Sequence, residues 1–412
     1  MLIFATSAAA WECVLNSDPN GPAEFYAVDK DNQELLFFYN KSPLKKMLDV
    51  PCSTGQSRGD KFREGDLKTP EGVYFVENRL RRDLNFTLYG NLAYSLNFPN
   101  PVDRLNGKTG HGIWVHGRGN GIASFGTKGC VAMNLGDLQD IGNDIAPGQT
   151  PVIIARDIAW QSGRSEDNTR VSTRLASNSQ KWARAWSERS DSFFSFYAPK
   201  SYSKAQKTSF EHFKARKQRL FDQYGWIDVW IDKPKVIKGP NYWVTYFGQV
   251  YNAPGFNSAG IKRLYWMPDA NGEFKVIGSE WRGKDGDRLK KAYFKQRGEE
   301  LFHFVRKWKD AWKRADIDDY KRFYAKDISQ EGRDGLRAVV KHKKSIWESG
   351  SIPQKIEVSD FSFSLVAEGF KVRFVQDYQD SSGYADLGVK TLIVAPLKTG
   401  WKIVREDWRQ IN

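Results

Sequence analysis

A histidine and a cysteine fourteen residues apart are the side chains of this sequence best suited to chemistry. His116 closes a short apolar run before Gly117, and Cys130 stands between Gly129 and Val131. A free thiol is mostly protonated near neutral pH, so a nucleophilic cysteine needs a base beside it, which His116 can supply. Glycine before the cysteine lets a carbonyl approach the backbone and leaves amide groups for an oxyanion. The pattern predicts Cys–His catalysis; the alternative is a buried structural cysteine and a structural histidine.

Short motifs around this pair follow one another along the chain. They are Ser53-Thr54-Gly55, Thr69-Pro70-Glu71-Gly72, Pro99-Asn100-Pro101 and Thr127-Lys128-Gly129-Cys130. The segment Met47 to Ile154 that contains them resembles the catalytic domain of L,D-transpeptidases, the YkuD-type domain, whose members carry a His, a gap of similar length and then Ser/Thr-x-Gly-Cys. The resemblance implies a mainly-β catalytic domain, which we expect at residues 20–158.

The resemblance also implies roles for individual residues. Cys130 would be the nucleophile, His116 the base that takes its proton, and the carbonyl of Gly117 the group that orients the imidazole. The N–H groups of Gly129 and Cys130 would hold the oxyanion. The other residues of the expected substrate loop are Lys128, Thr127, Ser124 and Arg118. The thiolate would attack the carbonyl of an L-centre joined to a D-amino acid, leaving a thioester for water or an amine to resolve.

Two positions depart from the usual family pattern. Lys128 stands where many members have His, and Ala132 stands where many have an Arg that is expected to help hold a substrate carboxylate. The Thr-Lys-Gly-Cys-Val-Ala variant resembles the branch of L,D-carboxypeptidases that set cell shape in curved and helical bacteria. We therefore expect an enzyme that trims tetrapeptide stems of peptidoglycan to tripeptides.

Two other functions stay open on the sequence. One is L,D-transpeptidation, which includes cross-linking, D-amino acid exchange and attachment or detachment of wall proteins. The other is a wall-binding scaffold, which the intact His116, Gly129 and Cys130 disfavour. The expected partners are peptidoglycan stem peptides and, through the domains after the catalytic one, the wall or a divisome or elongation protein.

Composition fits a globular chain with a basic surface. A length of 412 residues suits about two to three domains, and a hydrophobic content of 40% suits a sizeable core. The net charge of +14 favours anionic partners, but the basic residues are scattered and no zinc-finger or RNA-binding signature occurs, so no nucleic-acid partner is expected. No run reaches the ~18 apolar residues of a membrane helix, so no transmembrane segment is expected.

The cysteines and histidines have no spacing that would form a metal site, and no cofactor is expected. Cys130 has to be a free thiol if it is the nucleophile. Cys13 and Cys52 could form a disulfide in an oxidising compartment or remain reduced and buried, and the sequence leaves both open.

The first residues bear on location. Met1 to Ala10 resembles the end of a secretory signal, with a short apolar run and small residues but no basic region. We therefore expect a periplasmic or cell-envelope protein.

Alternation of apolar and polar residues predicts the strands that must position the pair. The expected strands are 24–28, 35–39, 72–77, 112–116 and 151–154, and the expected helix is 135–141. His116 then closes a strand, and Cys130 lies in a Gly-rich loop before a helix, a common setting for reactive groups.

A long internal repeat follows, at an offset near 127 residues. Trp182-x-x-x-Trp186 recurs as Trp308-x-x-x-Trp312, and Phe247-Gly248-Gln249 recurs as Phe374-Val375-Gln376. A period of this length indicates two copies of a whole domain. Each copy shows helical periodicity first and strand alternation afterwards; the expected strands are 226–231, 242–250, 261–266, 356–358, 370–378, 390–394 and 401–404.

Helices followed by a curved antiparallel sheet form an α+β cone, which resembles the nuclear transport factor 2 (NTF2) superfamily. We expect cones at 176–283 and 298–412, with a polar linker or crossover at 155–180 and a second polar linker at 283–298. Five strand aromatics could line clefts or fill the cores of the cones: Trp243, Tyr246, Tyr251, Phe374 and Tyr378. The expected fold class is multidomain, a mainly-β YkuD-type domain followed by two α+β NTF2-like cones.

Overall fold

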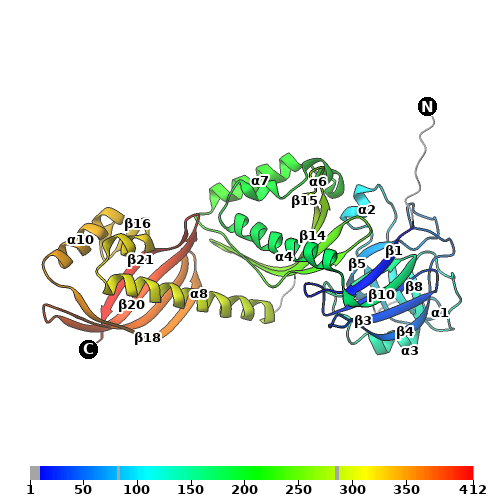
Figure 1. Ribbon diagram of the computed structural model, residues 1–412, viewed down its shortest axis with the longest axis horizontal. Coiled ribbons are helices and arrows are strands. Elements are labelled where there is room, and N and C mark those ends of the chain that lie inside the picture. The colour runs from blue at the N-terminus through cyan, green and yellow to red at the C-terminus, as the bar shows by residue number, and fades with distance from the viewer. Residues whose placement is uncertain (1–9, 81–83, 284–286, 412) are drawn as a thin grey trace.

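The computed structural model describes residues 10–80, 84–283 and 287–411, which form three units in a row (Figure 1). We call them the barrel unit (10–164), the first cone (165–283) and the second cone (287–411). The expected secretory signal lies, except for Ala10, outside the described residues. Within these three ranges, no helix is both long and apolar enough to cross a membrane.

The barrel unit is a closed barrel of eight strands in the order β2-β3-β4-β8-β7-β6-β5-β9. Their bounds are β2 (Glu24–Asp29), β3 (Glu34–Tyr39), β4 (Lys45–Ser53), β5 (Gly72–Leu80), β6 (Ala93–Leu96), β7 (Trp114–Arg118), β8 (Val131–Asn134) and β9 (Pro151–Ala155). The five predicted strands are confirmed as β2, β3, β5, β7 and β9, and the predicted helix is α3 (Leu135–Ile141). Two short helices, α1 (Phe86–Tyr89) and α2 (Pro101–Leu105), lie between the strands. Outside the barrel, β1 (Glu12–Ser17) pairs in parallel with β10 (Asp157–Arg164).

The first cone packs helices on one face of a curved antiparallel sheet (Figure 1). Its helices are α4 (Glu166–Ser187), α5 (Ser192–Ser195), α6 (Pro199–Gln206) and α7 (Phe210–Gln223). Its strands are β11 (Asp228–Ile231), β12 (Lys235–Lys238), β13 (Trp243–Ala253), β14 (Phe256–Pro268) and β15 (Phe274–Gly283), so the predicted strands are confirmed.

The second cone repeats this architecture with a six-stranded sheet. Its helices are α8 (Asp287–Lys313), α9 (Ile317–Tyr320), a 3-10 turn at Lys321–Phe323 and α10 (Leu336–Glu348). Its strands are β16 (Tyr324–Gln330), β17 (Arg333–Asp334), β18 (Pro353–Val366), β19 (Gly369–Asp380), β20 (Ala385–Leu397) and β21 (Gly400–Gln410), which confirms the predicted strands.

The repeated tryptophans perform the same task in both cones. Trp182 donates its indole N–H to the Tyr197 hydroxyl (2.9 Å), and Trp308 donates its indole N–H to Tyr324 (2.8 Å). The five strand aromatics are 1% to 8% exposed and belong to apolar core clusters, and the first three of them also line cavities: Trp243, Tyr246, Tyr251, Phe374 and Tyr378.

The prediction of polar linkers at 155–180 and 283–298 is wrong. β10 and α4 occupy 157–187, and α8 begins at Asp287, so each cone opens with a helix that starts before the predicted domain boundary. Inside the predicted linkers, Leu175 of α4 and Tyr293 of α8 are the apolar residues that these helices bury, and the tryptophans follow further along each helix. A long helix with so few apolar residues per turn resembles a polar linker in sequence.

The barrel unit and the first cone share one apolar core. The core residues that the first cone contributes are Ala205, Ile237, Tyr242, Val244, Tyr246, Tyr265 and Ile277, packed against barrel residues such as Phe75 and Val102. Arg263 is 3% exposed and donates to Glu77 of β5 (2.5 Å) and Glu280 (3.1 Å). The hydroxyl of Tyr242 accepts the backbone N–H of Val73 at the start of β5 (2.8 Å).

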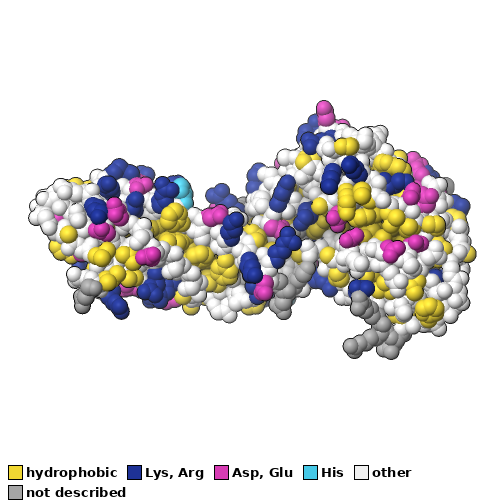
Figure 2. Space-filling view, turned by 90° about the horizontal axis from the view of Figure 1, so that it is seen from below, with side chains coloured by type: hydrophobic (Ala, Val, Ile, Leu, Met, Phe, Trp, Pro, Cys, Tyr) yellow, Lys and Arg dark blue, Asp and Glu magenta, His cyan; other side chains and the backbone are white. Residues whose placement is uncertain are grey.

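Basic side chains are not gathered on one of the three units. On the face seen in Figure 2, Lys and Arg are spread over all three units, so the net charge of +14 is not gathered in one patch there.

We expect a chain that ends at Arg164 to be far less stable than one that ends at Gly283, because it exposes the barrel half of the shared core. Each large apolar side chain exposed costs ~1.5–3 kcal/mol, and a loss of several of them lowers Tm by at least about 10 °C. Thermal unfolding followed by circular dichroism measures the difference. Equal Tm values for the two chains would contradict a shared core.

Candidate active site

His116 and Cys130 lie on neighbouring strands of the barrel. β7 and β8 are parallel, with Val115 opposite Val131 and His116 opposite Ala132. Cys130 immediately precedes β8. Because side chains alternate between the faces of a strand, Cys130 and Ala132 are on the same face of the sheet as His116. The residue after Cys130 begins strand β8, and the predicted helix α3 follows that strand.

The imidazole of His116 is buried and held in one orientation. Its Nδ1 lies 2.8 Å from the Gly117 carbonyl oxygen. A carbonyl only accepts, so Nδ1 carries the hydrogen and Nε2 keeps its lone pair, as a base requires. Tyr89 packs edge-on against the ring, at 5.1 Å between centroids. Burial lowers the pKa of His116 below 6.5, and the positive charge of Arg118 lowers it further. The hydrogen bond to Gly117 raises the pKa only in part, so the ring is neutral at pH 7.

The thiol of Cys130 is half-buried and protonated in this state. Burial raises its pKa above 9.0, opposed by a backbone contact with Trp114 and by the charges of Lys61 and Arg118. The Sγ donates to the Gly112 carbonyl at 3.4 Å. The sulfur has to leave this carbonyl and turn to the imidazole before His116 can take its proton.

Thr127 organises the loop that carries the thiol. Its hydroxyl donates to the Cys130 carbonyl (2.7 Å) and accepts the N–H of Gly129 (3.0 Å). The expectation that the Gly129 N–H holds the oxyanion is therefore wrong for this conformation, because Thr127 already occupies it. The N–H of Cys130 stays the candidate donor. Gly129 itself has φ of +124°, and a Cβ there would lie 2.7 Å from the Lys68 carbonyl, so only glycine fits.

The other predicted loop residues divide into two groups. Arg118 donates to the Gly126 carbonyl (3.0 Å) and so ties β7 to the loop that leads to Cys130. Ser124 and Lys128 are exposed on that loop. The structure thus brings together His116, Gly117, Arg118, Thr127, Gly129 and Cys130, while Ser124 and Lys128 lie at the surface.

Lys61 is a charged residue beside the thiol that the motifs did not identify. Its side chain is 5% exposed, and its Nζ donates to Asp66 (2.7 Å) and to the Arg63 carbonyl (3.0 Å). Its positive charge favours the thiolate of Cys130. Only the closure of the loop between β4 and β5 brings it there, and no spacing in the sequence indicates this position.

A network of buried charges holds that loop. Lys30 donates to the Gly59 carbonyl, the Thr69 carbonyl and Glu71 at 2.6 to 2.9 Å. Lys108 pairs with Asp60 (2.7 Å) and Asp103 (3.0 Å). Buried ions of this kind are stable only when each has several partners. The Thr69 hydroxyl accepts the Gly55 N–H (2.8 Å), and Gly55 forms a bridge with Thr127, so the network reaches the cysteine loop.

The other two cysteines lie apart. Cys13 and Cys52 are both free and buried, and they belong to different core clusters, so of the two open alternatives the structure has the reduced one. Among the described residues, no three His, Cys, Asp or Glu side chains are grouped to hold a metal ion.

The family models that match this chain cover its three units one by one. The L,D-transpeptidase catalytic domain family (YkuD) matches residues 24–154, and the Cds6 C-terminal NTF2-like domain family matches residues 174–280 and again 300–407. These matches define the class, a YkuD-type β domain followed by NTF2-like domains. The chain belongs to the Cds6 C-terminal NTF2-like domain family, whose model matches it twice and covers just over half of its length, and its residues 24–154 match the L,D-transpeptidase catalytic domain. The predicted resemblance and fold class are confirmed.

Individual relatives share parts of this arrangement. The putative L,D-transpeptidase YafK of Escherichia coli K12 is 29% identical over 124 residues, which are 29% of this chain and 46% of that protein, so the match spans less than half of this curated relative. Bd1075 of Bdellovibrio bacteriovorus has a TM-score of 0.51 at 25% identity, with 66% of this chain and 97% of that chain covered. Pgp2 of Campylobacter jejuni, a helical cell shape determining protein, shares the fold with a TM-score of 0.50 at 24% identity, over 63% of this chain and 91% of its own.

Iodoacetamide should label Cys130 much faster than the two buried cysteines, since burial raises the pKa of Cys13 to about 12 and that of Cys52 further. Labelling of Cys130 should keep accelerating as the pH rises through 9.0, because its thiol pKa lies above that value. His116→Ala should slow labelling near neutral pH, whereas His212→Ala, at an exposed site, should not. Mass spectrometry of labelled peptides measures the rates. Equal, slow labelling of all three cysteines would argue against an activated thiol.

Proposed function

We propose that the protein is a cysteine-dependent L,D-carboxypeptidase that removes the terminal D-residue from tetrapeptide stems of peptidoglycan. The observation that carries this proposal is the pairing of β7 with β8, which puts a half-buried thiol and a neutral imidazole tethered through Nδ1 on one face of a barrel of the L,D-transpeptidase family.

The reaction follows from these positions. The Cys130 thiol gives its proton to Nε2 of His116, and Sγ attacks the carbonyl carbon of the L-centre. The C–N bond to the D-residue breaks, and His116 returns the proton to the departing amine. Water then loses a proton to His116 and attacks the thioester, which releases the shortened stem and restores the thiol. The tethered Nδ1–H keeps the imidazole in the tautomer that both steps need.

The surroundings of the thiol support this role. The resting pair is neutral, and the positive charges of Lys61 and Arg118 favour the thiolate that forms during attack. The N–H of Cys130 is the proposed oxyanion donor. Thr127 holds the loop through its bonds to Gly129 and Cys130. The mechanism needs no metal and no cofactor at this site.

Hydrolysis is favoured over transfer to an amine by position 132. In the usual pattern an Arg there is expected to hold a carboxylate, whereas this chain has a fully buried Ala132 opposite His116. Without this cation, the site binds the carboxylate of an acceptor peptide less tightly. Water then competes better for the thioester. L,D-transpeptidation stays the second candidate, and the products distinguish the two.

Purified wall fragments with tetrapeptide stems should lose one D-alanine on incubation with the protein, and Cys130→Ala should abolish the loss. Cys13→Ala, which removes a buried cysteine of β1 outside the closed barrel, is the matched control. Mass analysis of the products measures the reaction. Joined stems or exchanged D-amino acids would instead establish the transpeptidase, and unchanged stems would refute both.

We further propose that the first cone binds the wall through carboxylates of the stem peptides. A cavity of about 360 Å³ opens between α7 and the sheet, lined by residues that include Trp186, Lys217, Gln249 and Lys262. Lys217 Nζ lies 3.5 Å from the centroid of the Trp186 ring. Burial lowers the pKa of Lys217, and the neighbouring charge of Lys262 lowers it further. A carboxylate between the two ammonium groups would restore their charge.

Polar atoms in this cavity also lack partners. Among the described residues, the Trp186 indole N–H and the Gln249 amide oxygen are buried without a hydrogen bond. Such groups are costly unless a ligand or water satisfies them. A ligand with both acceptors and donors, such as a peptide with a free carboxylate, meets this demand.

The second cone has filled the equivalent place with its own carboxylate. Lys390 corresponds to Lys262 in the repeat, and it pairs with the buried Glu406 at 2.7 Å. The residue that corresponds to Glu406 in the first cone is Ser279, whose hydroxyl accepts from Lys262 at 3.1 Å. Lys262 therefore lacks the buried carboxylate partner that Lys390 has, and this difference favours the first cone as the place where a stem carboxylate binds.

Ser279→Glu should weaken binding to sacculi by about tenfold or more, because the new carboxylate would pair with Lys262 as Glu406 pairs with Lys390. Ser195→Glu, which adds the same charge at an exposed site of the first cone, is the control. Co-sedimentation with purified sacculi measures the affinity. Equal binding of both variants and the natural chain would rule out this cavity as the wall site.

A further inference from the structure

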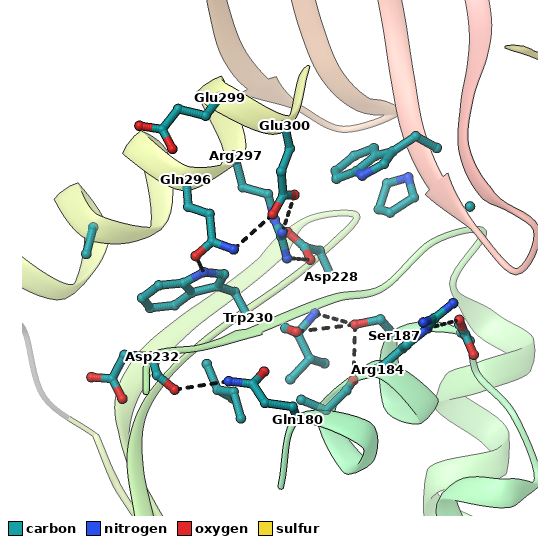
Figure 3. A pocket seen from close by; sticks show the side chains of 18 of the residues that line it. Gln180, Arg184, Ser187, Asp228, Trp230, Asp232, Gln296, Arg297, Glu299 and Glu300 are labelled. Carbon is teal, nitrogen blue, oxygen red and sulfur yellow. Dashed lines mark hydrogen bonds and ion pairs between the residues drawn. The ribbon is translucent and has the colours of Figure 1, made fainter. Parts of the chain in front are cut away.

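The two cones enclose a cleft that neither cone has by itself. The cavity has a volume of about 1130 Å³. Figure 3 shows one wall made by α4 and β11 of the first cone, with Gln180, Arg184 and Trp230, and the opposite wall made by α8, with Gln296 and Glu299. The turn between β20 and β21, including Trp401, closes the second wall. Duplication of the cone is what creates this cleft.

The two walls are fixed to one another at the floor of the cleft. Arg297 of α8 donates twice to Asp228 of β11 (2.7 and 3.1 Å), and Asp228 is 2% exposed. The Tyr293 hydroxyl donates to the same carboxylate (2.8 Å). Trp230 donates its indole N–H to Gln296 (2.8 Å) and belongs to the core of the second cone. The cleft is therefore preformed, and a ligand would not have to close it.

The charge of the lining differs from that of the whole chain. Five acidic and four basic side chains face the cleft, whereas the chain as a whole has a net charge of +14. These are Glu188, Asp228, Asp232, Glu299 and Glu300, against Arg184, Lys233, Lys295 and Arg297. Without a net positive charge, this lining offers no attraction to a peptide rich in carboxylates, unlike the cavity of the first cone.

The lining suits an uncharged ligand rich in hydroxyl groups. Planar carboxylate, amide and guanidinium groups can each bind neighbouring hydroxyls through two hydrogen bonds, and the half-buried indole of Trp401 offers apolar surface with a polar edge. The volume exceeds the ~300–1,000 Å³ typical of pockets for small molecules, which favours an extended ligand. Sites of this composition at the junction of two domains are common places for ligands.

We propose that the cleft between the cones binds the glycan strand of peptidoglycan, as a chain of N-acetylated amino sugars. This inference rests on the proposed function, since it assumes that the protein works on the wall. It divides recognition between two places: the stem peptide meets the cations of the first cone, and the sugar backbone meets the cleft beside it.

The test uses the hexamer of N-acetylglucosamine, which has the sugar chemistry without any peptide. Calorimetric titration of the full chain should detect binding, and Ala292→Trp should weaken it by at least about tenfold. Ala292 lines the cleft and is exposed on α8, so an indole there fills the cleft without removing a buried contact. Ala338→Trp, on the exposed face of α10, is the matched control and should bind as the natural chain does. Thermal unfolding checks that both variants fold.

Three outcomes would overturn the proposal: no binding of the hexamer to the natural chain, equal binding by Ala292→Trp, or binding of a sugar-free tetrapeptide that Ala292→Trp abolishes. The last would make the cleft a peptide site. D-alanine release from a soluble tetrapeptide tests the proposed function separately, and Ala292→Trp should leave it unchanged because the cleft lies outside the barrel unit. A chain that binds the hexamer but releases no D-alanine would refute the enzyme and keep the sugar site.

Discussion

The parallel pairing of β7 with β8 is the constraint on which the rest of the molecule depends. It closes one side of the barrel and puts His116 and Cys130 on the same face of the sheet. Two parallel neighbouring strands need a crossover connection between them. The thirteen residues between His116 and Cys130 form this crossover and include the loop that presents the thiol. That loop has little secondary structure of its own, so Thr127, Arg118 and the buried charges beneath the neighbouring loop hold it in place.

The barrel unit depends in turn on the first cone. The barrel does not complete its core alone: Tyr242 and Tyr246 from β13 pack into it, and Arg263 lies buried between Glu77 and Glu280. A buried guanidinium is tolerable only because both carboxylates and the Gly148 carbonyl surround it. The orientation of the first cone relative to the active site is thus determined by packing and paired charges, and a wall strand held by the cone would meet the barrel in a defined direction.

The duplicated cones share one fold but differ in their buried charges. The tryptophan–tyrosine hydrogen bond and the aromatic core are the same in both, while position 279 is serine and its counterpart 406 is glutamate. That one difference gives Lys390 of the second cone a buried carboxylate partner, whereas Lys262 of the first cone has the Ser279 hydroxyl in its place. The second cone instead supplies α8 and the β20–β21 turn to the cleft between the two. Local charges and placement, more than the fold, distinguish the two cones.

The sequence by itself determined the class of the protein, because its evidence is local. The spacing of His116 and Cys130, the glycines beside them, strand alternation and the tryptophan repeat are all written along the chain, and the strands they predicted formed as expected. Helical spacing predicted the later parts of α4 and α8, around Trp182 and Trp308, but their first turns were missed because those turns bury few apolar residues. Lys61, the Thr127 bond that occupies the Gly129 N–H, the shared core and the cleft between the cones were decided only by the tertiary structure. Each of them joins segments far apart in the chain, and burial, which sets the charge states of the thiol, the imidazole and the lysines, exists only once those segments have packed.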